Sequence, residues 1–160
     1  ARWYIKGLML PGERKSVEPM AARVAPEQVC SAHQSMHHLL ADAPWSDEAM
    51  LSAVARRVLP ELIAPDDAVH WILDDTGFPK KGKHSVGVAR QYCGQTGKQD
   101  NCRVTVSLSI ATERGSLPIG YELYLPREWA DDEARRSKAG VPDEVEFKTK
   151  PALAMKQIEA

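Results

Sequence analysis

Apolar residues recur at helical spacing over the first part of the chain. One helix face is indicated by residues at the i, i+4, i+7, i+11 spacing, namely Val29, His33, Met36 and Leu40. A second helix is predicted after Ser46, which suits an N-cap, and its apolar stripe consists of Leu51, Val54, Ala55, Val58 and Leu62. Pro60 is expected to kink or end that helix. We therefore predict a helical region over residues 1–65.

The apolar spacing changes from helical to alternating after Pro65. Residues 69–75 are apolar and β-prone up to Asp74-Asp75, which predicts a strand that runs into a loop. Residues 77–102 are rich in Gly, Lys and Gln, and predict a long loop with one extended stretch over 85–92. Residues 103–112 and 117–125 both alternate between apolar and polar positions, with a turn between them, so we expect an antiparallel hairpin.

The chain beyond Pro126 is polar and charged as far as Pro142, and a last helix is predicted to begin near Pro151. Helices followed by strands and a final helix predict the α+β class. We expect two regions, a helical one over 1–65 and a second one over 66–160.

Composition narrows the class of protein. The chain has 160 residues, of which 43% are hydrophobic and 27% charged, as in one globular domain or two small lobes. No apolar run approaches the roughly 18 residues of a membrane span. Three cysteines do not make a disulfide framework, so we expect a reducing, cytoplasmic compartment. The chain starts with neither Met nor a signal peptide, and we expect it to begin inside a longer gene product.

Charge is unevenly distributed although the net charge is only −1. Between Asp74 and Arg103, basic residues outnumber acidic ones by three. Basic residues around adjacent acids are expected where phosphates meet metal ions, and a solvated loop with scattered lysines is the alternative interpretation.

Asp74 and Asp75 form the most informative candidate site. Two adjacent carboxylates repel each other unless a cation neutralises them, and carboxylate ligands suit Mg²⁺ or Mn²⁺. The alternative is a turn in which one carboxylate accepts hydrogen bonds from local N–H groups. Lys80, Lys81 and Lys83 follow without the spacing of a nucleotide-triphosphate loop. They either grip a nucleic-acid backbone as point charges or form a solvated run.

Longer motifs carry a family resemblance. The run over 71–94, WILDDTGFPKKGKHSVGVARQYCG, resembles the signature segment of bacterial insertion-sequence transposases of the Asp-Asp-Glu (DDE) type. Further segments are similar to the same family in order and spacing: residues 4–8, 13–16, 123–129, 139–142 and 147–151. The resemblance covers nearly the whole chain.

The resemblance implies a ribonuclease-H-like core whose first three antiparallel strands are 69–75, 102–112 and 117–125. It implies that Asp74 is the first catalytic acid, with Asp75 as the alternative, and that such acids hold two Mg²⁺ or Mn²⁺ ions for in-line phosphoryl transfer. Candidate contacts to the DNA backbone that border this metal site are Lys80, Lys81, Lys83 and Arg90. Transposon ends and target DNA would be the partners of a homo-oligomeric, nucleoid-associated bacterial enzyme.

The chain also departs from the family pattern. In the family, the second Asp and the Glu follow the Thr-Lys-Pro helix, which lies near the end of this chain. We therefore expect the incomplete first part of a catalytic domain over 66–160, inactive in DNA cleavage by itself. The alternative is a non-catalytic transposase remnant that serves as a DNA-binding or interaction module.

Overall fold

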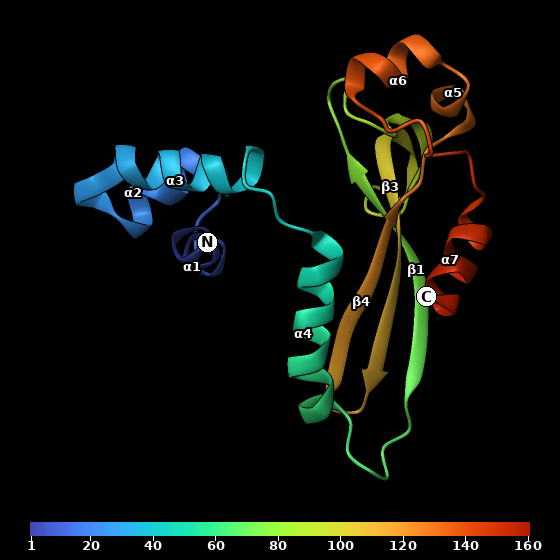
Figure 1. Cartoon of the computed structure of the whole chain (residues 1–160), viewed down its shortest axis with the longest axis horizontal. Helices are drawn as coiled ribbons and strands as arrows, with labels where there is room; N and C mark the ends of the chain where they lie inside the picture. Colours follow the sequence, from blue (N-terminus) through green and yellow to red (C-terminus); the bar gives the residue numbers. More distant parts are fainter. The chain divides into compact units, whose positions relative to one another are not determined.

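Helices form the first part of the chain and an antiparallel sheet most of the rest, in a computed structural model that describes residues 1–160 (Figure 1). This architecture confirms the α+β class and is consistent with a ribonuclease-H-like fold. Contacts within the chain group it into two units, Ala1–Asp47 and Glu48–Ala160. The helical region expected over 1–65 therefore contributes to both units. No helix has both the length and the apolar character needed to cross a membrane.

The first unit is a small helical cluster. Its elements are α1 (Arg2–Met9), α2 (Val17–Val24), the 3-10 helix η1 (Pro26–Gln28) and α3 (Val29–Ala41). Its buried core consists of Met20, Ala21, Ala32 and Met36. Gly7 allows α1 and α2 to pack closely, because a Cβ at this position would lie 2.9 Å from Cβ of Met20. The absence of a side chain at Gly7 thus lets Met20 of α2 approach α1 closely.

Helix α4 (Asp47–Leu62) forms as predicted, but its apolar stripe is not buried. No residue of α4 is buried, and Val54 remains 42% exposed. Of the two effects expected of Pro60, a kink or an end of the helix, the helix does not end there, because it continues to Leu62. The missing N–H of Pro60 removes only one hydrogen bond in the last turn, which the helix tolerates.

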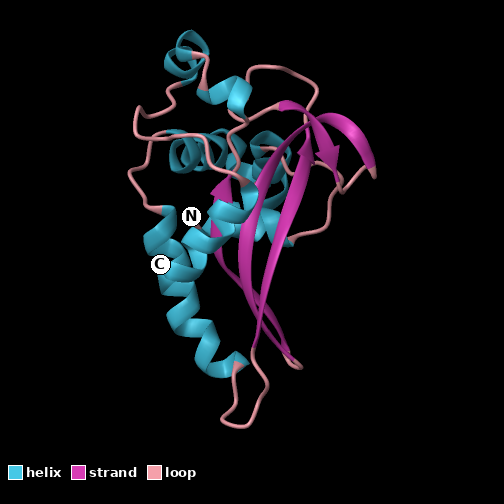
Figure 2. Ribbon diagram, turned by 90° about the vertical axis from the view of Figure 1, so that its right-hand side faces the viewer, coloured by secondary structure: helices cyan, strands magenta, loops and turns pink.

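The sheet of the second unit is built around one long central strand. Its strands are β1 (His70–Pro79), β2 (Ala89–Cys93), β3 (Lys98–Thr112) and β4 (Gly115–Leu123). Strand β3 pairs antiparallel with each of the other three. The pairing of β3 with β4 confirms the predicted hairpin, and the twist of the long strands is visible in Figure 2.

Two expectations about this sheet are wrong. The first strand does not end at Asp75 but continues to Pro79, because residues 76–79 pair with residues 102–105 of β3. Residues 77–102 are not a long loop, since they hold the end of β1, all of β2 and the start of β3. Strands β2 and β3 meet in a tight hairpin in which Cys93 pairs with Lys98. The fourth strand, β2, overlaps the extended stretch expected over 85–92 and joins the three strands that the resemblance implied.

The core of the second unit lies on one face of β3. The alternating residues of β3 that point to this face are buried: Val104, Val106, Leu108 and Ile110. Helix α7 (Lys150–Glu159) packs on it through buried Leu153, and Gln157 Nε2 donates a hydrogen bond of 3.2 Å to the Val106 carbonyl. Thr149 caps this helix by accepting a hydrogen bond from the Ala152 N–H at 3.3 Å. The predicted last helix is thereby confirmed.

Two short helices, α5 (Arg127–Ala130) and α6 (Glu133–Ala139), occupy the polar segment for which no helix was predicted. Trp129 of α5 is fully buried with Leu125 and Val141, and its Nε1 donates a hydrogen bond of 2.8 Å to the Val88 carbonyl. This anchor fixes α5 and α6 against the segment that leads into β2.

Candidate functional site

Asp74 and Asp75 lie in the middle of β1, where they pair with Ser107 and Val106 of β3. Successive side chains of a strand point to opposite faces of a sheet. The two carboxylates therefore belong to different faces, and each has its own surroundings.

Asp75 lies on the face that α7 covers. Its Oδ2 forms an ion pair of 2.6 Å with Nζ of Lys150, the first residue of α7. Across the sheet, Glu122 also pairs with Val106, and its carboxylate forms a 2.8 Å ion pair with Lys156 of the same helix. Two lysines of α7 thus neutralise two acids of the sheet. The alternation of β4 places Glu122 on this face, but nothing in the sequence indicated its partner.

Asp74 lies on the opposite face, where its neighbours carry hydroxyl groups. Thr76, Thr105 and Ser107 share this face, and Ser107 Oγ donates a hydrogen bond of 3.5 Å to the Asp74 carbonyl. The Asp74 carboxylate accepts the N–H of Asp75 at 2.8 Å, and no lysine or arginine lies within ion-pair distance of it. The alternative interpretation expected a turn in which a carboxylate accepts a local N–H. The Asp74 carboxylate does accept such an N–H, but both residues lie in a strand and not in a turn.

The side chains around Asp74 have the oxygen atoms that a hard cation prefers, but there are too few carboxylates to hold the ion alone. Carboxylate and hydroxyl oxygens match the preference of Mg²⁺ and Mn²⁺. The chain contains no group of three or more His, Cys, Asp or Glu side chains that could hold a metal ion. Asp74 therefore fits the role of a single protein ligand to an ion that also binds water and substrate phosphate, which is common for Mg²⁺.

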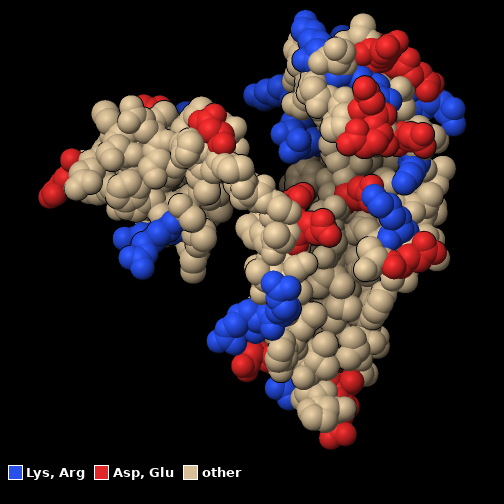
Figure 3. Space-filling view, viewed as in Figure 1, with Lys and Arg blue, Asp and Glu red and all other residues tan.

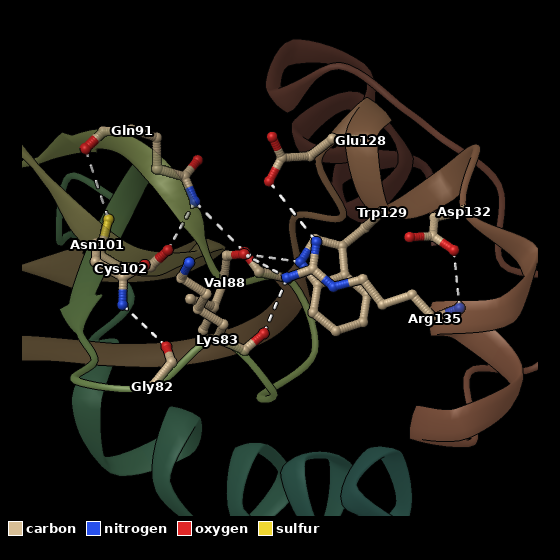
Figure 4. Close-up of polar contacts among 11 residues, drawn as sticks. Gly82, Lys83, Val88, Gln91, Asn101, Cys102, Glu128, Trp129, Asp132 and Arg135 are labelled. Carbon is tan, nitrogen blue, oxygen red and sulfur yellow. Dashed lines mark hydrogen bonds and ion pairs between the residues drawn. The ribbon is translucent and has the colours of Figure 1, made fainter.

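The residues 80–83, here called the lysine loop, are held from two sides. On one side, the Lys80 N–H donates to the Asn101 carbonyl at 2.8 Å, and Asn101 Nδ2 donates to the Gly82 carbonyl at 3.0 Å. On the other side, Arg135 of α6 donates to the Lys83 carbonyl at 2.9 Å (Figure 4). The backbone of the loop is thus fixed, while the side chains of Lys81 and Lys83 are exposed.

The lysine loop does not lie beside the aspartates. Lys80 is five residues beyond Asp75 along an extended strand, which corresponds to roughly 17 Å. Arg90 is exposed on β2 and pairs with Asn101, the residue that holds the loop. The candidate DNA-binding residues therefore gather at the end of β1, and residues 75–79 of the strand separate them from Asp74.

Two buried thiols lie behind this end of β1. Cys93 Sγ contacts the Gly77 carbonyl at 3.5 Å, and Cys102 Sγ lies 3.8 Å from the Gln91 carbonyl. Burial, together with the neighbouring Cys93, raises the pKa of the Cys102 thiol to about 11. Both cysteines are free and belong to the packed interior rather than to a metal site.

Comparisons with known proteins identify the family of the chain. A family model described as "DDE superfamily endonuclease" matches residues 1–160. The protein named "Probable transposase for insertion sequence element IS701" from Microchaete diplosiphon is 33% identical over 121 residues. This alignment covers 76% of the chain and 28% of the length of that relative. No solved structure matches the chain significantly. Because the family model matches the chain from end to end, this chain belongs to the DDE superfamily endonucleases.

Proposed function

We propose that this chain is a segment of a DNA transposase that cleaves and joins strands at insertion-sequence ends by metal-dependent phosphoryl transfer. The observation that carries this proposal is the difference between the two adjacent acids of β1. Lys150 neutralises Asp75 at 2.6 Å, whereas Asp74 has no cationic partner and lies among hydroxyl groups. Asp74 is therefore our candidate for the first catalytic acid, and Asp75 serves to anchor α7.

A bound divalent ion, Mg²⁺ or Mn²⁺, would activate water or a 3′-hydroxyl for attack and would stabilise the leaving oxygen. Asp74 would be the protein ligand from β1. The pairing of β1 with β3 fixes the backbone on both sides of Asp74, so the carboxylate is held on a rigid element, as catalytic geometry requires.

The lysine loop would bind the DNA backbone at a distance from the reacting phosphate. Lys80 is six residues beyond Asp74, roughly 20 Å along an extended strand, which corresponds to about six nucleotides of one strand at about 3.4 Å per phosphate. Lysines act on phosphates as mobile point charges, so these contacts would position DNA without reading its sequence. Arg90 extends the same basic end of the sheet.

Strand cleavage by the intact protein tests this proposal. A supercoiled plasmid that carries an insertion-sequence end is incubated with Mg²⁺ or Mn²⁺, and nicked product is measured. We expect Asp74→Asn to abolish nicking and the isosteric Asp75→Asn to retain it, with both variants folded by circular dichroism. Nicking that survives Asp74→Asn would overturn the assignment of Asp74, and metal-independent nicking would overturn the reaction type.

A further inference from the structure

A depression lies between the lysine loop and helix α6. It has a volume of about 520 Å³ and is lined by Lys83, His84, Asp132, Ala134, Arg135 and Lys138. A smaller hollow of about 160 Å³ adjoins it and shares His84, Arg135 and Lys138. Residues from two parts of the chain about fifty positions apart therefore form one concave surface, at the end of the sheet where charged side chains gather (Figure 3).

Arg135 is the fixed element of this depression. Its guanidinium lies 3.7 Å from the centre of the buried Trp129 ring. Its Nη2 donates to the carbonyls of Lys83 at 2.9 Å and Val88 at 3.4 Å, and Glu128 lies 3.9 Å from Nη1 (Figure 4). These contacts tie α6 to the lysine loop, so the cations on both walls keep their separation without a ligand.

The charge of the walls favours an anion. Lys83 and Lys138 are exposed and form no ion pair, and His84, the residue after Lys83, is also exposed and lines the depression. The one acid in the lining, Asp132, already accepts a hydrogen bond from the Arg135 backbone N–H at 2.9 Å as the cap of α6. The lining thus holds three lysine and arginine side chains and one carboxylate, and Arg135 is paired with Glu128 from outside the lining, which leaves Lys83 and Lys138 as the unpaired cations.

We propose that this depression binds a backbone phosphate of duplex DNA. Lys83 and Lys138 supply the positive charge, His84 donates a hydrogen bond, and Arg135 is a positioning residue that holds the two walls together. The inference rests on the proposed function, since it requires the chain to bind DNA. It extends the DNA contact from the lysine loop to α6, a helix that the sequence did not predict.

The test measures binding of a fluorescent 20-base-pair duplex to the 160-residue chain over about 50–200 mM KCl. Lys138→Gln is compared with Lys148→Gln, which removes an exposed lysine from the same unit but outside the depression. One lost phosphate contact lowers the salt slope by about 0.9 and weakens binding up to about 8-fold at 0.1 M salt. We expect this change for Lys138→Gln. His84→Ala, which removes a hydrogen-bond donor and no lysine charge, should weaken binding without changing the salt slope, and Lys148→Gln should change neither.

Two further arms separate the possible failures. If the triple variant of Lys80, Lys81 and Lys83 to Ala loses affinity while Lys138→Gln matches Lys148→Gln, the depression is not a DNA site and only this inference fails. If the unsubstituted chain does not bind duplex DNA at all, the proposed function fails with it.

A second experiment tests binding of a small anion. Inorganic phosphate is titrated at constant ionic strength while the His84 ring is followed by NMR. Saturation by phosphate without an effect of Lys138→Gln on DNA binding would assign the depression to a small anion and contradict the proposal.

Discussion

At the scale of single residues, the close approach of β1 to the β2–β3 hairpin depends on the absence of a side chain at Gly77. A Cβ at this position would lie 2.9 Å from Cys93 Sγ and 3.0 Å from Cys93 Cα. The second of these atoms is backbone and cannot move without shifting the strand. Gly120 differs, because a Cβ there would meet the amide oxygen at the end of the flexible Gln157 side chain, at 2.6 Å.

We therefore predict that Gly77→Ala lowers the free energy of unfolding by about 1–3 kcal/mol, the usual cost of overpacking. Gly120→Ala, the matched control, should cost less than about 1 kcal/mol because Gln157 can turn away. Urea unfolding followed by circular dichroism measures both values. Equal costs for the two variants would show that the contact with Cys93 does not limit the packing.

The thiol of Cys102 leads to a prediction about how the free energy of unfolding changes at alkaline pH. Burial raises the pKa of its thiol from 9.0 to about 11, so between these values the folded chain keeps a proton that the unfolded chain has lost. The unfolded state then binds fewer protons, and the free energy of unfolding falls as pH rises from about 9 to 11. Unfolding curves in this pH range should show a shallower fall for Cys102→Ala than for the unsubstituted chain. An identical pH dependence would exclude Cys102 as a source of the fall.

At the scale of elements, helix α7 is held by two kinds of contact with unequal energies. Leu153 is buried against the sheet, with 4% of its surface exposed. The ion pair of Lys150 with Asp75 is short, but its side chains are 34% and 44% exposed. Exposed ion pairs contribute little because solvent screens them. Apolar burial is therefore the main attachment of α7, and the ion pair fixes the position of its first turn.

We predict that Leu153→Ala lowers the free energy of unfolding by roughly 2–4 kcal/mol. Lys150→Met, which removes the charge but retains the aliphatic stem, should cost less than about 1 kcal/mol. The free energies of unfolding of the two variants, measured with denaturant, show which contact contributes more to stability. A larger cost for Lys150→Met would mean that electrostatics, not burial, holds the helix.

Elements with local signals were predictable from the sequence. Strands β3 and β4 alternate cleanly, and α7 begins with a capping threonine and a proline, so neighbours along the chain were enough to define them. Strand β2 was anticipated only as an extended stretch over 85–92, without a partner strand, and helix α6 was not predicted. They depend on contacts across the fold, such as Arg135 with the Lys83 carbonyl and Trp129 with the Val88 carbonyl. Local patterns do not contain these contacts.

The sequence identified the two acids of the candidate site but not the residues that contact them. Asp74 and Asp75 were singled out by their charge and by the family resemblance, and strand alternation alone would have placed them on opposite faces. The pairing of Asp75 with Lys150 joins residues 75 positions apart, so the sequence could not show which acid is neutralised. Glu122, Arg135 and Lys138 were missed for the same reason.

At the scale of the whole molecule, β1 has a partner strand on one side only. It pairs with β3, and large apolar side chains along it are exposed: Trp71, Ile72, Leu73 and Phe78. An exposed apolar edge strand is a template for pairing with another chain. The 160-residue chain should therefore self-associate, and Ile72→Lys, which places a charge on this edge, should reduce that association. Sedimentation velocity over a concentration series measures it, and a monomeric unsubstituted chain would contradict the prediction.

The 160-residue chain should not nick supercoiled plasmid in Mn²⁺ by itself. In-line transfer needs both the attacking and the leaving oxygen stabilised, usually by two ions about 3.5–4 Å apart. The chain offers no group of three potential metal ligands to hold them, and its two adjacent aspartates lie on opposite faces. Nicking by this chain that disappears in Asp74→Asn would show that its own residues complete the catalytic site.

Whether Asp74 rather than Asp75 holds the catalytic ion is measured by a Mn²⁺ titration of the intact protein in an isothermal calorimeter. Asp74→Asn removes a carboxylate without a cationic partner, whereas Asp75→Asn removes one that Lys150 already neutralises. We expect a loss of affinity of roughly tenfold or more for Asp74→Asn and little change for Asp75→Asn. Unchanged affinity in Asp74→Asn, or a loss confined to Asp75→Asn, would contradict this expectation.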